Sequence, residues 1–163
     1  MSDTEALYQE IILEHNRKPR NFREMPDADR TVQGRNPMCG DALTLWVKWG
    51  DDDRIADVSF KGEGCAISKS SASIMTTAVK GKTRAEAAAV FEKFHNLVKG
   101  TLPEDEQKSL GSLRAFGGVA RFPQRVKCAS MAWHALKSAL DGDDRIVTET
   151  SDPTGAPGEG AWA

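Results

Sequence analysis

The segment "LTLWVKWGDDDRIADVSFKGEG", residues 43–64, decides the fold class. Apolar and polar side chains alternate along both halves of this segment, which is typical of strands with one buried face. The acidic stretch "GDDD" separates the halves, so we expect an antiparallel hairpin with its turn there. The residues expected on the buried face are Leu43, Leu45, Val47, Trp49, Ala56, Val58 and Phe60.

Helical patterns lie on both sides of this hairpin. Residues 5–15 form an amphipathic helix whose apolar stripe is expected to contain Leu7, Tyr8, Ile11 and Ile12. Two prolines interrupt the pattern over residues 16–30, which we interpret as an ordered loop or an extended arm. A short strand is expected around residues 31–33.

Three helices are expected after the hairpin. The first starts near Cys65 and is stopped by Gly81, and a capping box "TRAE" at residues 83–86 starts the second. Residues 102–120 are polar and contain glycine, so we expect one short helix at most there. Pro123 fits the first position of the last helix. This order predicts an α+β fold, a small antiparallel sheet with helices packed on one side.

The composition predicts one domain. A chain of 163 residues with 39% hydrophobic residues can form a single core, which we assign to residues 1–140. Residues 141–163 lack periodicity and are rich in Gly, Pro, Ser, Thr and acids, so we expect a disordered tail.

Charge and hydropathy exclude some partners. The net charge is −2 and the Lys and Arg residues are scattered, which argues against nucleic acid. No apolar run is long enough to span a bilayer, and no signal-peptide pattern opens the chain, so no membrane is expected. An odd number of cysteines, three, suits a reducing compartment, and we expect a cytoplasmic protein.

The cysteines are placed where the predicted fold brings them together. Cys39 and Asp41 precede the first strand of the hairpin and Cys65 follows the second, so all three lie at one end of the sheet. Cys128 lies near the start of the last helix. Thiolates and a carboxylate in this combination suit a tetrahedral Zn(II) site. The spacing alone also allows three unrelated buried cysteines that pack as small hydrophobic residues.

Two other kinds of site are less well supported. His15, His95 and His134 are scattered, and we interpret each as a surface or capping residue rather than as the partner of a catalytic cysteine. The segment "GEGCAISKSS" has glycines before a helix start but lacks the pattern of a phosphate-binding loop. We interpret its glycines as allowing a tight turn beside Cys65.

Four motifs, taken in order, resemble one family. They are "LYQEIILEHNRKPRNF", "NPMCGD", "GEGCAISKSSASIM" and "FGGVARFPQRVKCASMAWHAL". The chain resembles, over residues 6 to 140, the U-type iron-sulfur cluster assembly proteins, namely IscU, SufU and the N-terminal part of NifU. The resemblance implies an α+β fold and a site for Zn(II), or for iron or a [2Fe-2S] cluster, at Cys39, Asp41, Cys65 and Cys128.

Two departures separate the branches of that family. The scaffold branch, on which a [2Fe-2S] cluster is assembled, has histidine directly before the last cysteine, where this chain has Lys127. A charged lysine cannot act as a ligand in its place. The chain also has extra residues at about 94–118, as the SufU branch does. The resemblance therefore favours a zinc-dependent sulfurtransferase, with the cluster scaffold as the alternative.

The SufU-like branch implies a mechanism and partners. A SufS-type cysteine desulfurase would supply persulfide sulfur, and downstream iron-sulfur assembly proteins would receive it. The resemblance implies that a histidine of the desulfurase replaces Cys39 on zinc and frees it as the sulfur acceptor. Arg125, one turn before Cys128, is expected to orient Asp41 or to stabilise negative charge on sulfur; a solvated surface residue is the alternative.

Overall fold

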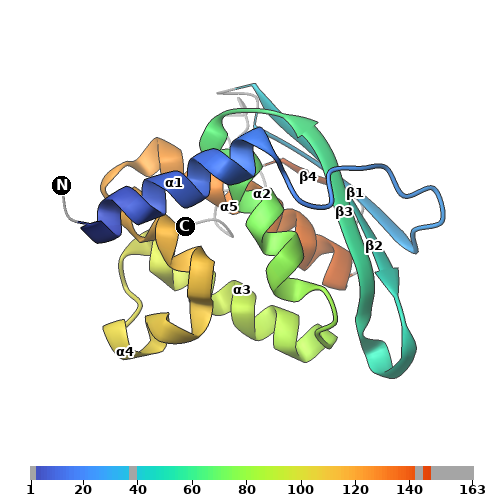
Figure 1. The fold of residues 1–163 in the computed structure, drawn as a ribbon. Coiled ribbons are helices and arrows are strands. Elements are labelled where there is room, and N and C mark those ends of the chain that lie inside the picture. The colour runs from blue at the N-terminus through green and yellow to red at the C-terminus, as the bar shows by residue number, and fades with distance from the viewer. Residues whose placement is uncertain (1–2, 37–39, 142–144, 148–163) are drawn as a thin grey trace, which may run out of the picture.

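The computed structural model describes residues 3–36, 40–141 and 145–147 of the chain. A sheet with strand order β3-β2-β1-β4 lies on one side of the molecule and the helices pack against one of its faces (Figure 1). The predicted α+β class is confirmed. The elements are α1 (Asp3–Arg17), β1 (Arg30–Asn36), β2 (Asp41–Trp49), η1 (Asp51–Asp53), β3 (Ile55–Glu63), α2 (Ala66–Val79), α3 (Arg84–Lys99), α4 (Glu104–Gln107), η2 (Lys108–Arg121), α5 (Pro123–Asp141) and β4 (Arg145–Val147).

Of the seven residues expected on the buried face of the β2–β3 hairpin, only Ala56 is exposed. Leu45 pairs with Phe60 in the antiparallel register, and both side chains are buried. Ala56, expected on the buried face, is exposed, and its neighbour Ile55 is fully buried instead. The pairing skips Ala56 between Lys48 and Trp49, which makes it the extra residue of a β-bulge. A bulge reverses the alternation, and the sequence pattern alone did not indicate it.

The β1–β2 connection lies at the end of the sheet where the candidate ligands lie. β1 is longer than the predicted residues 31–33, and its last residue, Asn36, is the register partner of Asp41. The Gly40 N–H donates to the Asn36 carbonyl at 2.9 Å, and Gly40 has a φ of +74°. Glycine adopts this left-handed conformation without a steric penalty. The two strands are therefore joined by residues 37–40, which include Cys39.

β4 lies within the segment expected to be a disordered tail. It pairs in parallel with β1, with Gly34 opposite Ile146. Three residues are too few to show a period, and the pairing connects positions more than 100 residues apart, so the local sequence did not indicate this strand. Asp141 ends α5, and the prediction for residues 142–144 and 148–163 lies outside the described residues.

Helices α2 and α5 form the layer that covers the sheet. The Ser71 hydroxyl donates to the Ala129 carbonyl at 2.6 Å, and the Trp133 indole N–H donates to the Ser71 oxygen at 3.1 Å. The Trp133 ring is stacked on Phe94 with centroids 4.4 Å apart. These contacts fix α5 against α2 and α3. The predicted starts of α3, at the Thr83 capping box, and of α5, at Pro123, are confirmed.

The N-terminal helix and the arm after it lie along α2. The expected apolar stripe is partly wrong, because Leu7 is 58% exposed, whereas Ile11 and Ile12 pack against the core. The arm is anchored where the Arg20 N–H donates to the Ser73 hydroxyl at 2.8 Å. Phe22 meets the core residue Phe60 edge-on, at the outer edge of β3.

Residues 102–121 are more helical than expected. They form α4 and then the 3₁₀ segment η2, which contains a kink at Gly111. The buried side chains of η2 recur mainly every third residue, which is the period of a 3₁₀ helix rather than an α-helix. A 3.6-residue period therefore does not describe this segment. The buried residues of η2 are Leu110, Leu113, Ala115, Phe116 and Val119.

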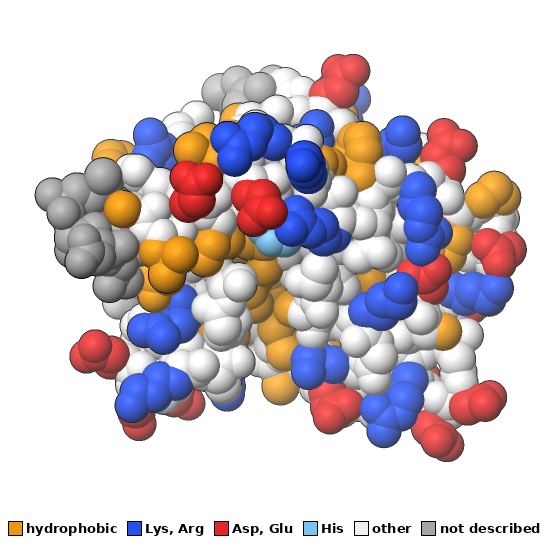
Figure 2. All heavy atoms as spheres, viewed as in Figure 1, with side chains coloured by type: hydrophobic (Ala, Val, Ile, Leu, Met, Phe, Trp, Pro, Cys, Tyr) orange, Lys and Arg blue, Asp and Glu red, His pale blue; other side chains and the backbone are white. Residues whose placement is uncertain are grey.

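The surface is mixed in charge. On the face shown in Figure 2, Lys and Arg side chains are spread over the surface among Asp and Glu. Within the described part of the chain, every helix is too short or too polar to span a lipid bilayer.

Candidate metal centre

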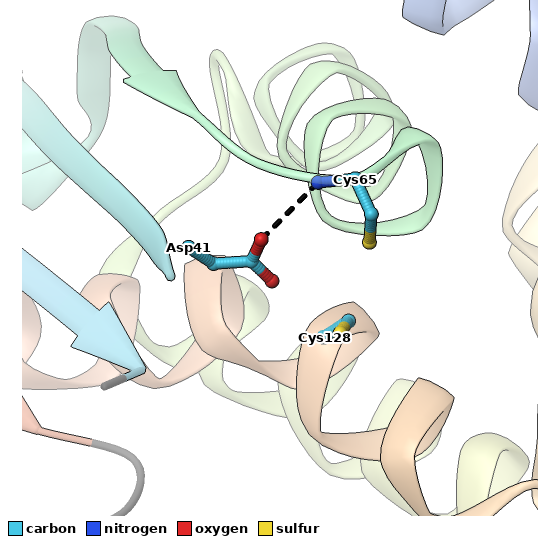
Figure 3. A group of neighbouring side chains, drawn as sticks. All are labelled: Asp41, Cys65 and Cys128. Carbon is cyan, nitrogen blue, oxygen red and sulfur yellow. Dashed lines mark hydrogen bonds between the residues drawn. The ribbon is translucent and has the colours of Figure 1, made fainter. Parts of the chain in front are cut away.

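Three predicted ligands meet at one end of the sheet, where β2 begins. Asp41 opens β2, Cys65 immediately precedes α2, and Cys128 lies in the second turn of α5. One carboxylate oxygen and the two sulfurs all lie within 4.8 Å of one another. Figure 3 shows the three side chains directed toward the same small space, although they come from three different elements.

The Asp41 carboxylate is held by the backbone of Cys65. Its side chain is almost fully buried, and Oδ1 accepts a hydrogen bond from the Cys65 N–H at 3.1 Å. The other oxygen faces the space between the two sulfurs (Figure 3). One oxygen therefore fixes the orientation of the carboxylate beside the two sulfurs.

The two cysteines have different surroundings. Cys65 is exposed and is the N-cap of α2, where its sulfur accepts a hydrogen bond from the Ser68 N–H at 3.5 Å. Free N–H groups at a helix start favour a negatively charged sulfur. Cys128 is buried within α5. The structure thus places one sulfur at the surface and one beneath it.

Their ionisation differs accordingly. The Cys128 thiol donates a hydrogen bond to the Cys65 sulfur and lowers the pKa of Cys65 to about 6, with the Ser68 N–H contributing and partial burial opposing. The pKa of Cys128 is raised, because its proton is held by Cys65, because it is buried and because Asp41 lies nearby. Before any metal binds, the first negative charge of the pair therefore resides on Cys65.

The donor set fits a zinc ion. Zinc binds cysteine sulfur at about 2.3 Å and carboxylate oxygen at about 2.0 Å, so the donors of a tetrahedral site lie about 3.5 to 3.8 Å apart. Donor atoms within 4.8 Å of one another reach these separations by small side-chain rotations. Asp41, Cys65 and Cys128 supply three donors, and a tetrahedral site takes a fourth.

The remaining predicted site residues are not part of this cluster as described. Cys39 lies outside the described residues. Arg125 is exposed, and its guanidinium lies over the Phe122 ring at 4.5 Å. Lys127, directly before Cys128, is also exposed. The role assigned to Arg125 stays a prediction.

The described donor cluster contains no histidine, and His134 is not the surface or capping residue that we expected. His134 is only 7% exposed and packs edge-on against Phe91 and His95, between α3 and α5. Burial, with positive charge on His95 and Lys137, lowers the pKa of His134 to about 3. His134 is therefore a neutral core residue at physiological pH.

Sequence reasoning missed Ser68, whose backbone and side chain both contact Cys65. A serine three residues after a helix N-cap is the available signal, because the N–H at that position is the one an N-cap side chain reaches.

The fold and this donor cluster define a class of protein, a small α+β domain with a candidate metal centre of thiolates and a carboxylate at one end of its sheet. Residues 7–144 match the family described as NifU-like N terminal domain. The chain belongs to this family.

Its relatives have two kinds of name. The "Iron-sulfur cluster assembly scaffold protein IscU" of Streptococcus pyogenes is 42% identical over 86% of this chain and 86% of its own length. The "Zinc-dependent sulfurtransferase SufU" of Bacillus subtilis is 38% identical over 85% of this chain and 92% of its own. The family therefore acts in iron-sulfur cluster assembly, and its members are named for two different roles.

A solved structure agrees in fold. The structure is that of a candidate iron-sulfur cluster assembly scaffold protein for the SUF system (FiSufU) from Fervidobacterium islandicum AW-1. It is 33% identical, with a TM-score of 0.75 over 83% of this chain and 97% of that one.

Proposed function

We propose that this protein is a zinc-dependent sulfur acceptor and carrier that takes persulfide sulfur from a cysteine desulfurase and delivers it for iron-sulfur cluster assembly. The observation that carries the proposal is the donor set itself. Asp41, Cys65 and Cys128 converge beside the β1–β2 connection that contains Cys39, and the residue before Cys128 is a lysine. Three thiolates and one carboxylate complete a tetrahedral zinc site without a histidine.

Zinc, when bound, would keep the cysteine sulfurs deprotonated at neutral pH. The chain's own residues would then divide the work. Asp41, Cys65 and Cys128 hold the ion, and Cys39 accepts the sulfur. The thiolate of Cys39 attacks the outer sulfur of the desulfurase persulfide. A new sulfur-sulfur bond forms on Cys39, the bond within the donor persulfide breaks, and the desulfurase cysteine leaves as a thiolate. No net oxidation or reduction is needed.

Two features favour Cys39 over the other cysteines as the acceptor. Cys128 is buried within α5, so a partner protein cannot reach its sulfur without moving the helix. Cys65 is exposed, but its sulfur and backbone are tied into the start of α2 and to Asp41. Cys39 belongs to the connection between two strands and needs no helix to move. Cys65 is the competing acceptor.

The remaining parts of the proposal follow from the same chemistry. A SufS-type desulfurase is the proposed donor, and downstream iron-sulfur assembly proteins are the proposed recipients. Reduced cysteines require a reducing compartment, so we propose a cytoplasmic location. Arg125 is proposed to stabilise negative charge during transfer, for which its exposed position beside Phe122 leaves the guanidinium accessible to a partner. Residues 1–140 are proposed to form the working domain.

A cluster scaffold is the second candidate. It is favoured by the name of the relative from Streptococcus pyogenes, which is 42% identical to this chain. The three cysteines and Asp41 would then hold a [2Fe-2S] cluster, or iron, instead of zinc. Anaerobic reconstitution with iron and sulfide distinguishes the two, because a scaffold yields a stable chromophore that transfers to an acceptor protein.

Desulfurase turnover tests the proposal. Purified protein is expected to contain about one zinc per chain and to accelerate sulfide production by a SufS-type desulfurase. Cys39→Ala should abolish the acceleration, whereas Cys65→Ala and Cys128→Ala should lose zinc as well. Acceleration that survives in Cys39→Ala would transfer the acceptor role to Cys65, the exposed cysteine among the described residues. Acceleration by a metal-free preparation would contradict zinc dependence.

A further inference from the structure

We propose that Ser68 is a positioning residue that, together with the bare Cα of Gly64, locks the Cys65 sulfur and the Asp41 carboxylate into one ligand pair. This inference deepens the proposed function and rests on its metal site. Neither residue has a donor atom in the candidate ligand set, so the effect is exerted through the ligands that they contact.

Ser68 contacts Cys65 at three points. Its N–H donates to the Cys65 sulfur at 3.5 Å, and its hydroxyl donates to the Cys65 carbonyl at 3.1 Å. The hydroxyl oxygen also lies 3.8 Å from the sulfur. As a thiol, the sulfur donates to this oxygen. As a thiolate it has no proton, so the single hydroxyl proton of Ser68 would turn from the Cys65 carbonyl to the sulfur. The side chain of Ser68 is nearly buried, so water does not readily replace it.

Gly64 explains how Asp41 joins the same arrangement. A Cβ on Gly64 would lie 2.4 Å from the Ser68 hydroxyl oxygen and 2.6 Å from Asp41 Oδ1. Both oxygens therefore occupy the space that a side chain at this position would fill. The Asp41 oxygen in that space is the one that accepts from the Cys65 N–H. One residue without a side chain thus lets the serine, the cysteine and the aspartate pack together.

The physical consequence concerns both ligands at once. With Oδ1 bound to the Cys65 N–H, the orientation of the Asp41 carboxylate is fixed relative to Cys65. With two hydrogen bonds from Ser68, the Cys65 sulfur has its direction set and its electron density reduced. Hydrogen-bonding partners behind metal ligands commonly contribute 10- to 100-fold in metal affinity. We expect Ser68 to contribute in this range.

Ser68→Ala tests the proposal, with Ser70→Ala as the matched control. Ser70 lies in the same helix and is also buried, but its hydroxyl donates to the Ala66 and Ile67 carbonyls and not to Cys65. Zinc affinity is measured by competition with a chromophoric chelator. Ser68→Ala should bind zinc about 10-fold or more weakly than wild type, and Ser70→Ala should stay within about twofold.

A second readout separates positioning from general loosening of the helix. In the Co(II)-substituted protein, loss of a hydrogen bond raises the energy of the sulfur electrons, so the sulfur-to-cobalt absorption band of Ser68→Ala should move to longer wavelength. Melting of the metal-free Ser68→Ala and Ser70→Ala proteins should be similar. Equal zinc affinity in Ser68→Ala and wild type, or equal losses in both serine variants, would overturn the positioning role.

Gly64→Ala provides an independent test, because it retains every hydrogen-bonding group and only fills the shared space. It should weaken zinc binding at least as much as Ser68→Ala. A Gly64→Ala protein with wild-type affinity would contradict the packing argument. If wild type itself binds no zinc, the proposed function fails together with this inference, whereas a zinc-binding wild type with unaffected variants removes the inference alone.

Discussion

Cys65 and His134 both have a lowered pKa, and the causes are opposite. At the end of the sheet, the pKa of Cys65 is lowered to about 6 because Cys128 donates a hydrogen bond to its charged form. Between α3 and α5, the pKa of His134 is lowered to about 3 because burial disfavours its charged form. The donor cluster at the end of the sheet stabilises a negative charge on Cys65, and the core between α3 and α5 disfavours a positive charge on His134. One small domain therefore keeps its reactive chemistry and its stability in separate places.

Truncation of the core should produce the largest effect. Trp133→Ala removes a fully buried ring that stacks on Phe94, and leaves the Ser71 hydroxyl without the indole that donates to it. Loss of a buried tryptophan costs about 3–5 kcal/mol, which is a large fraction of the free energy of unfolding of an ordinary domain, about 5–15 kcal/mol. Urea denaturation measures this.

The same substitution tests how independent the two regions are. Trp133 and Cys128 share α5, so we expect weaker zinc binding in Trp133→Ala even at a temperature where it remains folded. Unchanged zinc affinity in the folded variant would mean that the position of Cys128 in the donor cluster does not depend on the packing of Trp133.

The pH dependence of stability should show the excluded charge of His134. The folded-state pKa is below the unfolded value of about 6.5, so the unfolded chain binds the extra proton first. Stability is therefore fully present above pH 6.5 and falls as the pH decreases toward 3. The loss from His134 should be about 2 kcal/mol between pH 7 and pH 5.

Denaturation across this pH range, in wild type and in His134→Leu, isolates the effect. The variant should have a flatter stability profile, whatever its stability at pH 7. His95 lies against His134, and the pKa of His95 is also lowered by burial, so a smaller slope should remain. Parallel profiles for the two proteins would show that His134 is protonated without cost.

The smallest effect, a change in reactivity without a large change in stability, is expected at Cys65. In metal-free protein carrying Cys39→Ala, the alkylation rate of Cys65 should rise with pH around a midpoint of about 6. Cys128→Ala removes the donor that stabilises the thiolate, so the midpoint should move toward the ordinary value of about 8.5. Peptide mapping after iodoacetamide treatment measures the rate. An unmoved midpoint would exclude Cys128 as the cause.

Much of the fold is encoded locally. Alternation over residues 43–64 specifies the hairpin, and the Thr83 capping box and Pro123 mark helix starts that the structure confirms. The departures have local causes that strict alternation of strand residues and a 3.6-residue helical period do not include. Ala56 forms a bulge, and η2 repeats every third residue. Leu7 is exposed, and single exposed apolar residues are common on surface helices, so an apolar residue alone does not predict burial.

The candidate site was predictable in part. Asp41 and Cys65 flank the hairpin, so antiparallel pairing brings them to the same end of the sheet, and their proximity to Cys128 follows the prediction. Ser68 did not stand out, because a serine near a helix start is common for reasons unrelated to ligands. The glycines before Cys65 indicated a tight turn, but not the contact of Gly64 with Ser68 and Asp41. Cys39 and Arg125 remain predictions.

The sequence by itself determined the hairpin, the principal helix starts and which residues could supply sulfur and carboxylate donors, because these depend on the order and spacing of neighbouring side chains. Only the tertiary structure decided which sulfur of the pair carries the first charge, which oxygen of Asp41 accepts from the Cys65 N–H, and that β4 pairs with β1. These properties arise from contacts between residues 24 to more than 100 positions apart, where local patterns carry no information.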